Sequence, residues 1–138
     1  MNQGREHSPT MGILDTVEQA LLNDALNVRF FPSKNLNLIL STLGDLMYPA
    51  AVIIYEGSIY KEEPSRTLGV SIVIISQMNN DIKESISKHL TLLDTIIDHF
   101  DYQIINDMKF NIQSDEPVQF DEGSGTMALV IKLSIEDN

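Results

Sequence analysis

The sequence predicts an α+β domain in which one mostly antiparallel sheet of four to five strands carries two main helices packed on one face. Three observations lead to this prediction. Residues 81–101 repeat apolar side chains at helical spacing, and residues 126–136 alternate apolar and polar side chains as a strand does. Two apolar runs, 50–56 and 67–76, lie between the predicted helices. Helices and strands are segregated along the chain, which favours a sandwich over a parallel sheet.

The first expected elements are a helix over 12–25, a strand over 28–31 and a short helix within 35–47. The tripeptide Ser-Pro-Thr at 8–10 offers a capping serine and an early proline to the first helix. Pro32 ends the strand. Five apolar residues share one face of the first helix: Ile13, Leu14, Val17, Ala20 and Leu21.

The two apolar runs are expected to form a hairpin whose connection is 57–65, because Gly57-Ser58 and Pro64-Ser65 are turn-forming pairs. Both runs carry apolar side chains on both faces. With two helices on one face, four of these side chains would point away from them: Val52, Ile54, Val73 and Ile75. We expect a neighbouring subunit to cover this second face, so these four residues are assigned to an interface.

The second half begins with the helix over 81–101, capped by Asn80 or Asp81. Its apolar stripe is Ile82, Ile86, Leu90, Leu93, Ile97 and Phe100, widened by Leu92 and Ile96. A strand or strand pair over 109–120 follows, in which four apolar residues have the same parity: Phe110, Ile112, Val118 and Phe120. After a turn at 121–125, the last strand should direct these side chains inward: Met127, Leu129, Ile131, Leu133 and Ile135.

Composition is that of one globular domain. The 138 residues suggest a flexible segment over 1–10 and a single domain over 11–138. The chain has no cysteine, which excludes disulfides, thiolate metal sites and cysteine nucleophiles. No apolar run approaches the ~20 residues of a membrane span, and the first residues do not resemble a secretory signal. We therefore expect no membrane partner.

The charge is strongly acidic. Twenty acidic residues against nine basic ones give a formal net charge of −11. Such a surface repels the phosphates of nucleic acids, and the basic residues are scattered singly, so specific nucleic-acid binding is not expected. The same surface would suit the wall of a channel through which DNA passes without adhering.

No group of residues predicts catalysis or a bound ion. His89 lies within the apolar stripe of its helix, and His99 diverges from Asp98 by about 100° around the helix axis. A zinc site needs three or four converging ligands, and the remaining histidine is His7. We therefore assign no catalytic, cofactor-binding or metal-binding residue. A hydrolase that uses His89, or His99 with Asp98, is kept as a competing hypothesis.

Ile59 and Tyr60 are unusual because they are large apolar side chains within an expected solvated connection. Two interpretations are open. The connection folds back on its own strands and buries them, or they form an exposed apolar tip that anchors an interface. The charged neighbours Lys61 to Glu63 and Arg66 would then form a polar rim.

The order of these features resembles the Mu-like prophage tail protein family, which is often linked to tail terminator or tail completion proteins. The resemblance covers most of residues 11–136, although 36–47 does not fit the family pattern. It rests on a short first helix followed by four segments: PAAVIIYEGSIY at 49–60, RTLGVSIVIIS at 66–76, LLDTIIDHF at 92–100 and GTMALVIKLSIED at 125–137.

The resemblance implies a structural role without catalytic residues. Such proteins form a ring, commonly hexameric, at the head-proximal end of a phage tail. Their partners would be copies of the same chain, the tail tube and the head connector, and their location the virion tail after assembly in the bacterial cytoplasm. In a ring each copy uses two different patches, and we expect the hairpin tip and the second sheet face to supply them. The alternative is a small-molecule-binding or regulatory α+β module that dimerises through its sheet.

Overall fold

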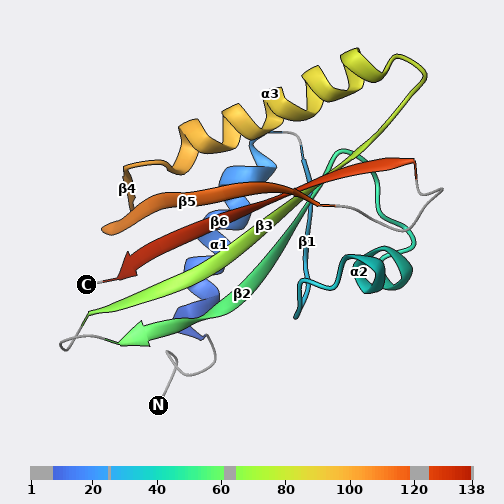
Figure 1. Ribbon diagram of the computed structural model, residues 1–138. Helices are drawn as coiled ribbons and strands as arrows, with labels where there is room; N and C mark the ends of the chain where they lie inside the picture. Colours follow the sequence, from blue (N-terminus) through green and yellow to red (C-terminus); the bar gives the residue numbers. More distant parts are fainter. Residues whose placement is uncertain (1–7, 25, 61–64, 119–124, 138) are drawn as a thin grey trace.

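The computed structural model describes residues 8–24, 26–60, 65–118 and 125–137. In this described part the chain is an α+β fold with three helices and a curled six-stranded sheet (Figure 1). The elements in chain order are α1 (Pro9–Leu22), β1 (Asn27–Phe30), α2 (Leu36–Thr42), β2 (Ala50–Tyr60), β3 (Arg66–Gln77), α3 (Ile82–Phe100), β4 (Gln103–Ile105), β5 (Met108–Val118) and β6 (Thr126–Asp137).

The helix ends follow from capping residues. Ser8 Oγ accepts a hydrogen bond from the Met11 N–H at 3.2 Å, and Pro9 stands at the start of α1. Ser8 therefore caps the helix and residues 9–10 belong to it, so that it begins three residues earlier than predicted. The other residues of the expected flexible segment, 1–7, lie outside the described part. Asn35 and Asp81 cap α2 and α3 in the same way.

The sheet has the order β1-β2-β3-β6-β5-β4, and it is mixed because β1 pairs with β2 in parallel while the other neighbours are antiparallel. The prediction of four to five strands missed β4, which has three residues. A two-residue turn joins it to β5, with Asn106 at φ 52° and Asp107 at φ 65°. Asn and Asp tolerate this left-handed conformation, so the turn is a short hairpin connection.

The main core lies between α1, α3 and one face of the sheet, as predicted. Helix α1 contributes Leu14, Val17 and Leu21 to it, and α3 contributes Ile96 and Phe100. The prediction that alternate side chains of β6 point inward is confirmed for the four that lie in this core: Leu129, Ile131, Leu133 and Ile135.

The second face of the sheet is covered within the chain itself. Helix α2 lies apart from α3, at one end of the sheet (Figure 1). Its fully buried Ile39 packs with Leu46 over a second apolar cluster. That cluster contains all four residues expected to meet a neighbouring subunit, at 0 or 1 % exposure: Val52, Ile54, Val73 and Ile75. The cover that sequence reasoning assigned to another copy is therefore supplied by α2 and the segment that follows it.

A bulge in β5 changes which face its side chains occupy. Ile112 pairs with Leu133 and Ser114 with Lys132, so Gln113 is one residue too many for the ladder. Phe110 and Ile112 consequently pack in the main core, whereas Val118 packs in the second cluster. The prediction that these residues share one face is therefore wrong for Val118. Phe120 lies outside the described residues.

The apolar stripe of α3 is also different from the prediction. The side chains that face the sheet are Ser85, His89, Leu93, Ile96 and Phe100. A hydrogen bond from Ser85 to Asn79 and another between His89 and Ser76 hold the first half of the helix in this orientation. The first three members of the predicted stripe are left exposed: Ile82 at 58 %, Ile86 at 43 % and Leu90 at 43 %.

This orientation predicts unequal costs for two leucines on the same helix. Leu93→Ala should lower the free energy of unfolding by about 2–4 kcal/mol, because it leaves a cavity in the main core. Leu90→Ala should lower it by less than about 1 kcal/mol, because Leu90 faces solvent. Urea unfolding of both variants measures the difference, and equal losses would contradict the described orientation of α3.

Candidate interaction surfaces

The β2–β3 hairpin is longer than the sequence predicted. Its ladder continues through the pairs Ile59 with Thr67 and Tyr60 with Arg66. The predicted connection, 57–65, therefore reduces to a shorter segment, of which 61–64 lie outside the described residues. Ile59 and Tyr60 are strand residues, held in place by backbone pairing.

A bulge at Glu56 makes this extension possible. The register shifts between Tyr55 and Gly57, and Gly57 takes φ 108°, a conformation that other residues rarely adopt. The bulged Glu56 is held on two sides: it accepts a hydrogen bond from Ser71 Oγ, and it forms an ion pair with Lys34 at 3.1 Å. These contacts stiffen the base of the hairpin.

The hairpin tip, defined as Ile59 and Tyr60, is exposed on both faces. Ile59 is 67 % exposed and Tyr60 is 72 % exposed, so neither side chain folds back on the hairpin's own strands. Adjacent strand residues point to opposite faces. Tyr60 lies on the face of Ser58, whose partner Leu68 belongs to the main core, and Ile59 lies on the face of α2. The tip therefore presents one large apolar side chain to each side.

An apolar groove lies beside the hairpin, on the face occupied by α1. Its open volume is about 500 Å³. Seven residues from α1, β1, the segment after β1, and β2 line it: Met11, Leu14, Phe30, Phe31, Pro32, Ile53 and Tyr55. We call it the α1 groove. Because its walls come from separate segments of the chain, no local sequence pattern could have revealed it.

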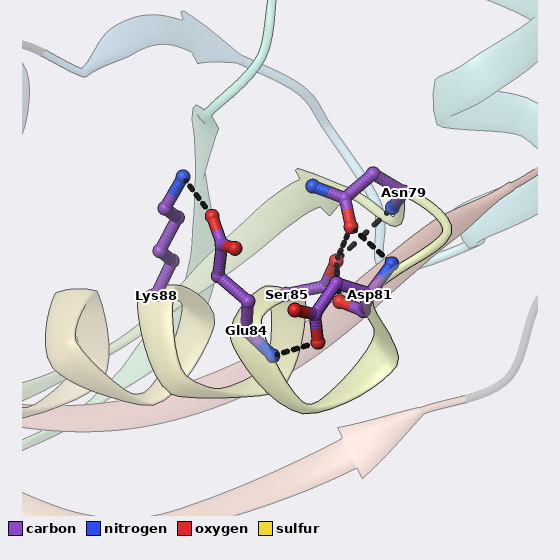
Figure 2. Close-up of polar contacts among 5 residues, drawn as sticks. All are labelled: Asn79, Asp81, Glu84, Ser85 and Lys88. Carbon is purple, nitrogen blue, oxygen red and sulfur yellow. Dashed lines mark hydrogen bonds and ion pairs between the residues drawn. The ribbon is translucent and has the colours of Figure 1, made fainter.

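The exposed residues Ile82, Ile86 and Leu90 form a third apolar surface, the α3 ridge. Figure 2 shows the polar contacts that hold the start of this helix. Asn79 Oδ1 accepts from the Asp81 N–H at 2.8 Å and lies 3.0 Å from Ser85 Oγ, and Asp81 Oδ1 accepts from the Glu84 N–H at 3.0 Å. These contacts fix the direction in which α3 leaves β3, and hence the direction in which the ridge faces.

His89 is a buried, hydrogen-bonded residue of the helix–sheet contact. Its Nδ1 lies 2.6 Å from Ser76 Oγ, and Nε2 is buried without a hydrogen-bond partner among the described residues. Burial lowers the pKa of His89, because the charged imidazolium loses its hydration. Ser76 also lines a pocket of about 210 Å³ under α3, together with Ser85 and Leu92.

The other histidine and acids that were considered for a site do not converge. His99 Nε2 lies 2.8 Å from Asp24 Oδ1, which joins α3 to the end of α1, while Asp98 is exposed. Asp101 Oδ1 accepts the Ile112 N–H of β5 at 3.2 Å. Within the described ranges, no cluster of three or more His, Cys, Asp or Glu residues could hold a metal ion. His7 lies outside these ranges.

Comparison with known proteins identifies no family. No family model matches the sequence, and no curated protein matches it significantly. None of the helices in the described part is long and apolar enough to cross a membrane. Function must therefore be inferred from the surfaces themselves, and the resemblance to phage tail proteins remains an expectation.

Burial of His89 predicts a pH-dependent stability. The pKa of His89 is lowered in the folded state from the ordinary histidine value of about 6.5. At a pH below that value the unfolded chain therefore binds a proton at His89 more readily than the folded chain does. The free energy of unfolding should fall as the pH drops from about 7 to about 5, and this dependence should be weaker in His89→Gln.

Urea unfolding at several pH values measures this dependence. Ser87→Ala, an exposed and non-titrating change on the same helix, is the matched control and should keep the wild-type pH profile. If His89→Gln and wild type lost stability in parallel, the assigned burial of His89 would be refuted.

Proposed function

We propose that this chain is a non-catalytic assembly subunit of a phage or prophage tail, of the terminator or completion type, which joins copies of itself into a ring. The observation that carries the proposal is the hairpin tip: Ile59 and Tyr60 project on a hydrogen-bonded ladder and are about 70 % exposed. Large apolar side chains held in an ordered, solvent-facing position favour association, because little entropy is lost when a partner covers them.

The interface is assigned to the tip and not to the sheet. Val52, Ile54, Val73 and Ile75 are buried under α2, so a neighbouring copy would have to displace that helix to reach them. The tip and the α1 groove need no such rearrangement. The second patch that a ring requires therefore lies among the surfaces beside the hairpin.

The charge supports a role around DNA without binding it. A net charge of −11 on each copy would line a ring with negative potential, which keeps passing DNA from adhering. The outer partners proposed for such a ring are the tail tube on one side and the head connector on the other. Its place would be the virion tail, following assembly in the host cytoplasm.

The alternative, a ligand-binding or regulatory module, is favoured by one observation, the pocket of about 210 Å³ under α3. Its dimerisation through a bare sheet is not supported, because α2 covers the apolar part of that face. A rise in melting temperature with one compound of a metabolite panel, lost in Ser76→Leu, would support this alternative.

Tyr60→Asp should prevent self-association while leaving the fold intact. The side chain is exposed, so the change removes no core contact, but it places a charge where a partner would bury an aromatic ring. Light scattering across a concentration series measures assembly, and circular dichroism measures folding. The matched control is Tyr102→Asp, because Tyr102 is 80 % exposed and lies outside the hairpin.

Wild type and Tyr102→Asp should form the larger species at high concentration, and Tyr60→Asp should stay monomeric. Two results would count against the proposal: a wild-type chain that remains a monomer at every concentration and ignores tail tubes, or a Tyr60→Asp variant that assembles normally.

A further inference from the structure

We infer that the α1 groove receives Tyr60 from the hairpin tip of a second copy of this chain. The inference rests on the proposed self-assembly and names the two surfaces that meet. Each copy would offer its tip to one neighbour and its groove to the other. Such a head-to-tail contact generates a closed ring, or an open filament if the rotation does not close.

The groove is an apolar surface left open to solvent. Met11, Phe30 and Tyr55 are each more than a third exposed although they stand side by side along its wall. Beneath them Leu14 and Ile53 are buried members of the main core, so the floor is rigid. An open volume of about 500 Å³ is larger than a tyrosine side chain needs. Interaction sites are typically apolar patches or hollows of this kind.

The groove cannot be filled by the tip of its own chain. Tyr55 lines the groove, and Tyr60 lies five residues further along the same strand, which at about 3.3 Å per residue is roughly 16 Å away. Pairing of Tyr60 with Arg66 prevents the strand from bending back. A tip that enters the groove must therefore come from another molecule, and a second copy carries a rigid apolar side chain of suitable size.

One charged residue of the hairpin, Arg66, fits the same pairing. Asp15 and Glu18 follow Met11 and Leu14 by one helical turn each, and α1 has no basic residue. On the hairpin, Arg66 is the cross-strand partner of Tyr60 and shares its face; it meets Asp137 through Nε at 3.6 Å. If Tyr60 entered the groove of a neighbour, Arg66 would approach the acidic rim of that neighbour's α1.

The area of contact sets the expected strength. The exposed part of Tyr60, with the matching surface of the groove, would bury roughly 300 Å² in total. A stable pair of proteins buries about 1,200 Å² or more. A single tip-in-groove contact is therefore weak. In a ring every copy makes two such contacts, so we expect association to depend strongly on concentration.

Cysteine cross-linking tests the contact directly, since the chain has no cysteine of its own. Ile59→Cys places a thiol next to Tyr60 in the chain, on the opposite face of the hairpin but within reach of a cross-linker, and Asp15→Cys places one at the rim of the groove. The two single variants are mixed, one of them isotope-labelled, and treated with a short bifunctional thiol reagent. Mass spectrometry then identifies products that join the two different variants. Asp94→Cys, at an exposed position on α3, replaces Asp15→Cys as the background control.

The tip-to-groove product should exceed the tip-to-α3 product by about tenfold, and adding Tyr60→Ser to the Ile59→Cys chain should remove most of that excess. Adding Tyr102→Ser instead should leave it unchanged. Equal yields in a chain that still forms oligomers would overturn the tip-in-groove contact and leave self-assembly standing. An excess that persists with Tyr60→Ser would refute the role of Tyr60. No cross-link and no oligomer at any concentration would overturn both proposals.

Discussion

The central strand β3 is the constraint on which the rest of this fold depends. It pairs with β2 on one side and with β6 on the other, and its residues from Val70 to Ser76 are buried on both faces. A strand that is apolar on both faces cannot meet water on either, so the chain must cover it twice. Helices α1 and α3 cover one face, and the short α2, with Leu46 from the segment after it, covers the other. The seven-residue α2 is thus as necessary to the sheet as the nineteen-residue α3.

The pairing of β3 with β2 also extends the hairpin beyond the part of the sheet that the helices cover. The ladder between β2 and β3 runs past the bulge at Glu56 and ends at Tyr60 with Arg66. The bulge moves one residue out of register, so Tyr60 shares the face of the main core but lies beyond α1. Backbone hydrogen bonds hold an exposed aromatic residue in an ordered position, which distinguishes a binding anchor from a mobile loop.

Two surfaces on one chain, a projecting tip and an open groove, are what a head-to-tail assembly requires. The polar groups of the described residues are engaged mainly in structural contacts: His89 with Ser76, His99 with Asp24, Asp101 with β5, and Asn79 with the start of α3. The hairpin tip, the α1 groove and the α3 ridge are apolar surfaces that the described residues leave exposed. This contrast between engaged polar groups and exposed apolar surfaces adds support to assembly as the proposed function, which rests on the hairpin tip.

Periodicity along the chain was sufficient to determine the α+β class, the three helices, the long strands and many residues of the main core, because these follow from local spacing and capping. It also singled out Ile59 and Tyr60. The tertiary structure decided the rest. A single extra residue at Gln113 moved Val118 to the other face, and hydrogen bonds at Ser85 and His89 turned Leu90 outward. Contacts between distant segments decide whether α2 or another copy covers Val52. Contacts of the same kind form the α1 groove. Such contacts leave no trace in local spacing, because each segment is equally apolar whichever partner it meets.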